Sequence, residues 1–215
     1  MKILFVSQHY RPEPFRLSDI CEDLVERGHE VTVLTGIPNY PEGKIYADYR
    51  NKQNRRETIE GVTVFRSYTI PRGKSTLHRI LNYFSFAISS SIGVLLGQYK
   101  AKDGSEFDCI FVNQSSPVMM AWAGMAYKNK YKKPLFLYCM DVWPDSLTVG
   151  GVKQDGLIFK LFKFISKKVY RASDYIFVTS PSFKNYFVKQ FDITEQKITY
   201  LPQYAEDLFI PDESI

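Results

Sequence analysis

The sequence predicts an α/β protein built on a doubly wound, mainly parallel sheet of about seven strands. Seven short apolar runs recur along the chain, and most of them are separated by segments long enough to form a helix. The runs are nearly continuous, without alternation of apolar and polar residues, as expected for strands covered on both faces. They occupy residues 3–6, 31–34, 62–65, 109–112, 135–138, 176–178 and 198–201.

The composition is that of an ordinary folded protein. Of the 215 residues, 45% are hydrophobic and 24% are charged, which argues against a disordered chain, a fibrous repeat or a disulfide scaffold. The three cysteines, Cys21, Cys109 and Cys139, have no CxxC spacing. They therefore indicate a reducing, cytosolic compartment and no zinc site. The net charge of +5 is too small for a diffuse polybasic binder but is compatible with a local basic patch.

The first elements follow one another closely. The apolar run at residues 3–6 is too short for a signal-peptide core and indicates a first strand. A helix follows, for which Ser18 or Asp19 can serve as N-cap and Gly28 as the left-handed end. The second strand begins directly afterwards. Residues 37–60 are then polar, with prolines and clustered charge, and predict a long loop of a kind that is often functional.

Residues 81–99 carry no charge and are long enough to span a membrane. Asn82, Ser85, Ser89 and Gly93 nevertheless line one narrow face of this stretch, which makes it polar for a span. The polar face favours a buried crossover helix. A membrane-surface helix and a true span are the alternatives.

Ligands of an open parallel sheet bind at the carboxyl ends of its strands. Polar and aromatic residues are concentrated directly after the first, second, fourth and fifth predicted strands, and we expect these loops to converge on one crevice. The candidate substrate-binding residues there are Arg11, Glu13, Arg16, Asn39, Tyr40, Gln114, Ser115, Trp143 and Asp145.

Several common enzyme classes are excluded by missing motifs. No glycine lies between Met1 and Arg27, so the first strand is not followed by the glycine-rich turn that binds dinucleotides. The sequence also contains no GxxxxGK[ST] motif and no GxSxG elbow. These absences argue against a P-loop NTPase and against the commonest hydrolase on such a sheet.

Asp141, His9 and Asn113 are the candidate catalytic residues. Asp141 and Asp145 flank Trp143, a combination of carboxylates and an aromatic platform that suits sugars. The structural alternative is that Asp141 caps the following turn and Trp143 plugs the end of the core. His9, after the first strand, can contact a phosphate or hydroxyl, or can be a structural histidine.

A basic amphipathic helix is predicted over residues 157–171. Its apolar face comprises Ile158, Leu161, Phe162, Ile165 and Val169, and Phe164 lies within the basic face. Such a helix indicates contact with an anionic membrane, and a solvated surface helix is the alternative. The candidate membrane-contact residues are Lys160, Lys163, Phe164, Lys167, Lys168 and Arg171.

Several motifs in a fixed order resemble the N-terminal domain of glycosyltransferase family 4, in the WbuB-like branch that acts in O-antigen and capsule assembly. They are KILFVSQHYRPEP, LVERGHEVTVLTGIPNYPEG, DYR, EGVTVFR, FVNQSSP, DVWPDS and ASDYIFVTSPSF. The ending KITYLPQYAEDLF is similar to the family's crossover into a second domain. The resemblance covers almost the whole chain.

The resemblance implies a retaining, Rossmann-like enzyme half of GT-B fold that transfers a hexosyl or N-acetylhexosaminyl group from a nucleotide sugar. The donor is expected to be UDP-linked, and the acceptor a lipid-linked or nucleotide-linked sugar in lipopolysaccharide or capsular polysaccharide biosynthesis. In such enzymes a donor phosphate oxygen is thought to accept the acceptor's proton. No cofactor or metal is expected, and the partners are the substrates and the inner face of the cytoplasmic membrane, without nucleic acid.

The same resemblance implies a domain division. Residues 1–201 would form the acceptor-side domain and residues 202–215 the start of an interdomain linker. We expect the donor-binding domain to lie outside this chain and the chain to be inactive alone. Two alternatives stay open: a stand-alone sugar- or lipid-binding module without catalysis, and half of a GT-B-type NDP-sugar epimerase.

Overall fold

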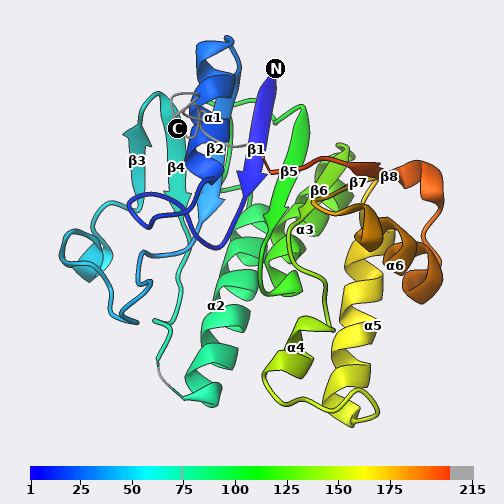
Figure 1. Ribbon diagram of the computed structural model, residues 1–215. Helices are drawn as coiled ribbons and strands as arrows, with labels where there is room; N and C mark the ends of the chain where they lie inside the picture. Colours follow the sequence, from blue (N-terminus) through cyan, green and yellow to red (C-terminus); the bar gives the residue numbers. More distant parts are fainter. Residues whose placement is uncertain (74, 204–215) are drawn as a thin grey trace, which may run out of the picture.

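Eight strands form one sheet in the computed structural model, which describes residues 1–73 and 75–203 (Figure 1). Their order is β3-β4-β2-β1-β5-β6-β7-β8, and every neighbouring pair is parallel except β3 and β4. The α/β prediction is confirmed, and each of the seven expected strands is present. The strands are β1 Lys2–Val6, β2 Glu30–Thr35, β3 Arg56–Ile59, β4 Val62–Arg66, β5 Cys109–Gln114, β6 Leu135–Cys139, β7 Tyr175–Val178 and β8 Ile198–Tyr200.

Strand β3 lies inside the region expected to be a loop. It pairs antiparallel with β4, and the two-residue turn Glu60–Gly61 that joins them has positive φ at both residues. A short 3-10 helix, η1 (Ala47–Lys52), precedes it. The prediction of one long loop over residues 37–60 was therefore wrong. Strand β3 has the sequence RETI at the edge of the sheet, so it lacks the apolar run by which buried strands are recognised.

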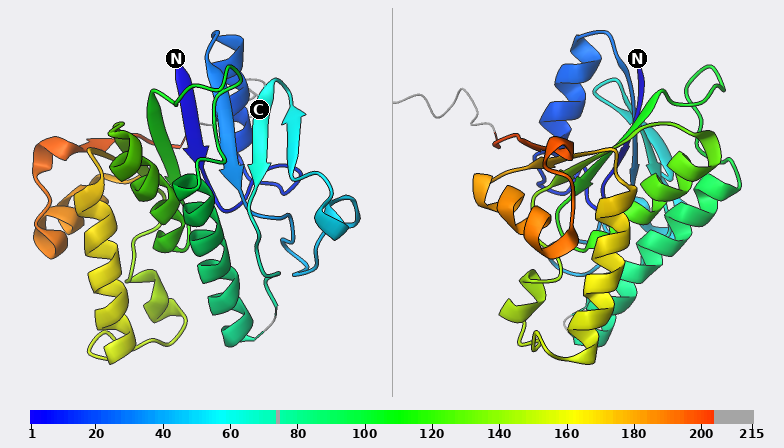
Figure 2. Two further views of the ribbon diagram at one scale, coloured as in Figure 1. Left: turned by 180° about the vertical axis from the view of Figure 1, so that it is seen from behind. Right: turned by 90° about the vertical axis from the view of Figure 1, so that its right-hand side faces the viewer.

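The helices cover the two faces of the sheet unequally (Figure 2). Helix α1 lies on one face, and α2, α3 and α5 lie on the other. The helices are α1 Leu17–Glu26, α2 Thr76–Leu95, α3 Trp122–Tyr131, α4 Ser146–Val149, α5 Leu157–Ala172 and α6 Pro181–Phe191, with short 3-10 helices η2 Val118–Ala121 and η3 Glu195–Lys197.

Helix α1 begins earlier than expected. Its first residue is Leu17, and the preceding Arg16 provides no side-chain cap, so neither Ser18 nor Asp19 is the N-cap. The Ser18 hydroxyl instead donates to the carbonyl of Phe15, which ties the helix start to the loop after β1. Gly28 has a φ of +82° directly after the helix, in agreement with the predicted left-handed end.

Helix α2 is the crossover between β4 and β5, and its polar face has a structural purpose. The Asn82 amide donates to the Ile70 carbonyl, the Ser85 hydroxyl accepts from the Ile70 N–H, and the Ser89 hydroxyl donates to the Tyr68 carbonyl. These bonds satisfy the irregular backbone that follows β4. Among the described residues, no helix has both the length and the apolar character needed to cross a membrane. The crossover is confirmed, but the helix is not buried throughout, because Leu81, Ile88, Ile92 and Leu95 are 41% to 58% exposed.

One face of the sheet is partly open, contrary to the expectation of strands covered on both faces. Within residues 1–73 and 75–203, α1 is the only helix on this face. Phe111, Phe136 and Phe177 project there from three neighbouring strands and form a row of stacked rings. The centroid of the Phe177 ring lies 6.1 Å from that of Phe111 and 6.2 Å from that of Phe136. They line an apolar groove of about 490 Å³.

Helix α5 buries only part of its predicted apolar face: Phe162, Ile165 and Val169 face the core as expected. Its buried residues are Phe159, Ser166, Val169 and Tyr170. Ile158 and Leu161, which were assigned to the apolar inward face, are 58% and 56% exposed. The outer face of α5 therefore combines aliphatic and basic side chains.

Candidate functional site

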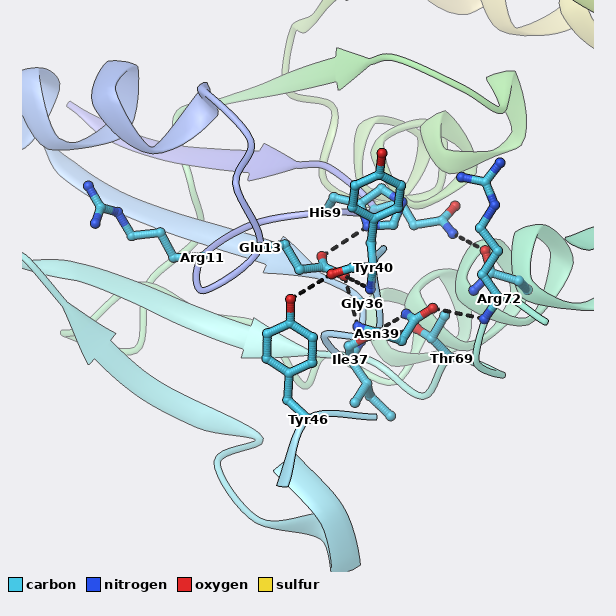
Figure 3. A network of polar contacts seen from close by, with 12 residues as sticks. His9, Arg11, Glu13, Gly36, Ile37, Asn39, Tyr40, Tyr46, Thr69 and Arg72 are labelled. Atoms are coloured by element: carbon cyan, nitrogen blue, oxygen red, sulfur yellow. Dashed lines mark hydrogen bonds and ion pairs between the residues drawn. The ribbon is translucent and has the colours of Figure 1, made fainter. Parts of the chain in front are cut away.

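The loops after β1 and β2 are joined by one buried carboxylate, that of Glu13 (Figure 3). Its Oε1 accepts the backbone N–H of Asn39 at 2.8 Å and that of Tyr40 at 2.7 Å. Its Oε2 lies 2.9 Å from Nδ1 of His9. Because Glu13 is only 3% exposed and both its oxygens are engaged, it holds the two loops together. This role differs from the direct substrate contact that we expected.

His9 and Asn39 are also fixed by neighbours within the protein. The His9 ring stacks on Phe15, with centroids 4.6 Å apart, and meets the edge of Tyr40 at 5.8 Å. The Asn39 amide donates to the Ile37 carbonyl and accepts the N–H of Arg72. Asn39 thereby joins the loop after β2 to the segment after β4, so the predicted convergence of loops is real at this end of the sheet.

A second cluster links the loops after β5 and β6. The Gln114 amide donates to the backbone carbonyls of Ser115 and Asp141 at 2.8 and 2.9 Å. The indole N–H of Trp143 lies 3.1 Å from both the Ser116 hydroxyl and Oδ2 of Asp141. Burial raises the pKa of Asp141, opposed by hydrogen bonds from Trp143, Ser146 and Ser116.

Trp143 is a core residue, which favours the structural alternative for this side chain. It is 2% exposed and packs between Tyr83 of α2 and Phe162 of α5, with ring centroids 6.5 and 5.5 Å away. Its backbone N–H and carbonyl both bond to the Tyr170 hydroxyl. The ring therefore anchors the β6 loop to two helices and does not form an open platform for a sugar.

A small hollow lies between the two clusters at the carboxyl ends of β5 and β6. Of the predicted site residues it brings together Arg16, Asn113 and Ser115. Their guanidinium, amide and hydroxyl groups are suited to hydrogen-bonding sugar hydroxyls or a phosphate. The other lining residues are Phe15, Leu17, Ile20, Tyr138, Met140 and Gln203.

Phe15 and Met140 were not predicted as site residues. Phe15 lines the hollow and also stacks on His9, so it connects the first cluster to the second. Its signal in the sequence is an aromatic side chain in a charged loop, RPEPFR. Met140 directly precedes Asp141, and its only signal is that position after the strand.

Arg11 and Asp145 neither line this hollow nor take part in either cluster. The Arg11 guanidinium pairs with Glu22 of α1 at 2.7 Å and lines a separate open cleft with Tyr49 and Ile59. Asp145 immediately precedes α4, where burial raises its pKa and the charge of Lys163 opposes that rise. The hollow therefore contains fewer of the candidate residues than the single crevice that we expected.

Another residue missed by sequence reasoning is Arg66, the last residue of β4. Its side chain is completely buried, its Nη2 donates to Oε1 of Glu57 and to the Arg11 carbonyl at 2.6 Å each, and it lies over the Tyr49 ring. Its bond to the Arg11 carbonyl holds the loop after β1 in place.

No group of three or more histidine, cysteine, aspartate or glutamate side chains that could hold a metal occurs in the part of the chain that the structure describes.

The predicted membrane-contact residues divide into two groups. Lys160, Phe164, Lys168 and Arg171 are exposed, and the Lys168 ammonium lies 4.5 Å from the centre of the Phe164 ring. Lys163 is half-buried and donates to the Gln190 side chain of α6. Lys167 is also half-buried. The set therefore does not form one uniform face.

Comparison with solved structures identifies the fold. The fold is similar to the calicheamicin glycosyltransferase CalG4, with a TM-score of 0.50 and 12% identity over 94% of this chain and 52% of that chain. It is also similar to apo UGT2 of Phytolacca americana, with a TM-score of 0.54 and 13% identity over 94% and 51%. At these identities the likeness concerns the fold alone, which is one Rossmann-like half of a GT-B glycosyltransferase.

Sequence comparison then gives the family. The Glycosyltransferase Family 4 model matches residues 16–203, and the chain belongs to this family. A colanic acid biosynthesis glycosyl transferase of Escherichia coli (strain K12), named WcaI, is 38% identical over 96 residues, which cover 42% of this chain and 23% of that protein. The chain spans about half the length of the two solved structures. The resemblance stated from the sequence is confirmed at the level of the family.

Proposed function

We propose that this chain is the acceptor-binding half of a retaining glycosyltransferase of the WbuB-like branch. It would act in the transfer of a hexosyl or N-acetylhexosaminyl group from a UDP-sugar to a lipid-linked or nucleotide-linked sugar during surface polysaccharide assembly. Residues 1–201 would form this half, and residues 202–215, most of which lie outside the described residues, would begin the linker to the donor-binding half.

Membership in family 4 supports a glycosyltransferase. The relative WcaI is named for colanic acid biosynthesis, which supports a polysaccharide pathway for this chain. The single observation that carries the acceptor assignment is the hollow that groups Arg16, Asn113 and Ser115 at the carboxyl ends of the strands. Neutral and cationic hydrogen-bond donors of this kind match the hydroxyl and phosphate groups of a sugar acceptor.

The proposed chemical steps are those that the resemblance to family 4 implies. The bond between the sugar's anomeric carbon and the donor diphosphate breaks, a bond to the acceptor oxygen forms, and the acceptor proton passes to a donor phosphate oxygen. Asn113 would then orient the acceptor, while Asp141 and His9 shape the site through their bonds to Trp143 and Glu13. No cofactor or metal is required by this scheme.

The proposed site of action is the cytoplasmic side of the membrane that holds a lipid-linked acceptor. Lys160, Phe164, Lys168 and Arg171 on the exposed face of α5 support contact with anionic lipid. Lys163 and Lys167 would add to the local positive charge from half-buried positions.

The test is a transfer assay on the protein encoded by the complete reading frame, with a panel of UDP-hexoses and UDP-N-acetylhexosamines and extracted membrane lipids as acceptors. We expect Asn113→Ala to lower turnover by at least about tenfold, the effect of losing one transition-state hydrogen bond, and Asp141→Ala to lower it by a similar factor through misplacement of the loop after β6. Glu42→Ala, at an exposed loop position, serves as control. Wild-type turnover in both site variants would overturn the assignment of this hollow.

A further inference from the structure

Two aromatic side chains, Phe15 and Tyr138, border the hollow that holds Arg16, Asn113 and Ser115. Tyr138 belongs to β6 and is only 4% exposed, so it offers little of its ring to a ligand. Phe15 lies in the loop after β1 and is half-buried. It also lines the separate open cleft next to this loop, so part of its ring is accessible. Phe15 is therefore the aromatic side chain of the hollow that a ligand can contact.

The Phe15 ring is covered by its aromatic neighbours on one face. It stacks on the His9 ring, with centroids 4.6 Å apart and an angle of 11° between the planes. Tyr40 lies 5.2 Å from Phe15 and 5.8 Å from His9. It is therefore beside the stacked pair, because a ring over the opposite face of Phe15 would lie much farther from His9. We refer to the face of the Phe15 ring opposite His9 as the Phe15 platform.

Hydrogen bonds hold Phe15 in this position. Its backbone N–H donates to the Glu13 carbonyl at 2.8 Å, and its own carbonyl accepts from the Ser18 hydroxyl at 3.2 Å. Glu13 and Ser18 are both buried, and the Glu13 carboxylate also pairs with the His9 ring on which Phe15 stacks. A side chain that is fixed before binding loses little conformational entropy when a ligand packs on it. The Phe15 platform is thus preorganised.

The hollow places the Phe15 platform next to polar and apolar side chains. The polar ones include Arg16, Asn113 and Ser115, and the apolar ones include Leu17, Ile20 and Met140. A pyranose ring has a matching division of its surface. The C–H bonds of its faces carry a small positive charge that is attracted to the negative face of an aromatic ring, and its hydroxyl groups at the edge accept and donate hydrogen bonds. A phosphate group has no apolar face, and an acyclic polyol has no flat one.

We propose that Phe15 is a specificity-determining residue, on which a pyranose ring packs while Asn113 and Ser115 bond its hydroxyl groups. The aromatic role that the sequence suggested for Trp143 then belongs to Phe15, whose ring is half-buried where that of Trp143 is fully enclosed. The inference rests on the proposed function only in taking the bound sugar to be the acceptor. The ligand class, a pyranoside with C–H groups on one face, follows from the side chains of the hollow.

The test uses saturation-transfer NMR on the protein encoded by the complete reading frame. The probe is methyl β-D-glucopyranoside, whose ring faces consist of axial C–H groups. We expect saturation of these ring protons, and at least about a threefold loss of affinity in Phe15→Leu, which keeps apolar bulk but removes the aromatic ring. Phe15→Tyr retains the ring and should bind within about twofold of the wild type. The matched control is Tyr175→Leu, which removes a half-exposed ring at the amino end of β7 and should bind like the wild type.

Sorbitol and uridine serve as comparison ligands, and circular dichroism checks that each variant is folded. Equal pyranoside binding by Phe15→Leu and the wild type would overturn the platform, as would the absence of saturation transfer to the pyranoside. Sorbitol binding as tight as that of the pyranoside would show that no ring face is recognised. Uridine binding that depends on Phe15, without pyranoside binding, would show that the ring stacks on a nucleobase.

Acceptor kinetics give a second readout. Because packing on a rigid ring is equally strong in the ground state and the transition state, Phe15→Leu should raise the KM for the acceptor at least about threefold and change kcat by less than about twofold. Pyranoside binding that depends on Phe15, without transfer from any UDP-sugar, would count against the proposed function alone. Transfer that Asn113→Ala slows and Phe15→Leu leaves unchanged would count against the platform alone.

Discussion

Glu13 shows how a single buried side chain can organise two strand-end loops. Its carboxylate accepts hydrogen bonds from two backbone N–H groups of the loop after β2 and pairs with the ring of His9 in the loop after β1. Buried N–H groups are costly when they lose their acceptor. Glu13 therefore determines the shape of two strand-end loops at once.

We expect Glu13→Ala to lower the free energy of unfolding by about 3 kcal/mol, because the N–H groups of Asn39 and Tyr40 would lose their acceptor inside the protein. Urea denaturation monitored by tryptophan fluorescence measures this change. Glu42→Ala, which alters an exposed loop carboxylate, should change stability by less than about 0.5 kcal/mol. Equal effects of the two substitutions would contradict the organising role of Glu13.

Asp141 should make stability depend on pH. Burial raises its pKa in the folded protein, so the folded state holds this proton more tightly than the unfolded state does. Its contribution to stability is full below the ordinary carboxyl pKa of about 4 and is lost as the pH rises through the raised value. Asp141→Asn removes this titration, so the variant should gain stability relative to the wild type as the pH increases from about 3 to about 7.

Urea midpoints of both proteins across that pH range provide the measurement for Asp141→Asn. A stability difference that stays constant, or that favours the wild type increasingly toward pH 7, would show that hydrogen bonds to the carboxylate outweigh its burial.

Residue identity alone predicted which loops carry the polar groups but not how these groups are used. Arg16, Asn113 and Ser115 meet at the hollow as their strand-end positions suggested. Glu13 and Trp143 were equally good candidates for substrate binding, but the side chains of both make their contacts inside the protein. Sequence position fixes the neighbourhood of a side chain, whereas burial and partners depend on packing between elements distant in the chain.

At the scale of elements, close packing of α3 on the sheet depends on Gly124. A Cβ atom at this position would lie 2.7 Å from Cγ2 of Val112 and 3.0 Å from Cδ1 of Leu135, which are side chains of β5 and β6. Both neighbours are fully buried and have little room to move. The glycine thus permits the helix to approach the two central strands.

Gly124→Ala should lower the free energy of unfolding by about 2 kcal/mol, since overpacking outweighs the roughly 1 kcal/mol by which alanine favours a helix. Thermal and urea unfolding provide the measurement. Asn129→Ala, at an exposed position of the same helix, should be neutral or slightly stabilising. A gain in stability from Gly124→Ala would show that α3 can shift away from the sheet without cost.

Elements with a strong apolar pattern were predictable, and those at edges or surfaces were less so. Seven strands, including the edge strand β8, follow from their apolar runs, whereas β3 was missed because its sequence RETI contains no such run. Helix α5 was placed correctly along the chain, and Phe162, Ile165 and Val169 of its predicted inward face pack against the core. Periodicity detects an apolar stripe, and here part of that stripe, Ile158 and Leu161, faces outward.

At the scale of the whole molecule, the fold separates two kinds of surface. The larger core cluster lies between the sheet and the layer of α2, α3 and α5, and a smaller one lies between the sheet and α1, next to the row of Phe111, Phe136 and Phe177. The sequence predicted the doubly wound arrangement, because alternating strands and helices allow few others. It could not predict that the helices would be shared so unequally between the faces, which depends on the strand order.

Helices α1 and α5 place charges of opposite sign on the two sides of the sheet, which contributes a dipole across it even though Glu22, Asp23 and Arg171 have ion-pair partners. A dipole in the field of a negatively charged surface experiences a torque at distances of about one Debye length, roughly 8 Å at physiological salt. The protein would therefore turn its cationic side toward such a surface before any side chain touches it. Dilution of the salt should lengthen the range of this alignment, so that a greater share of encounters begins in the productive orientation.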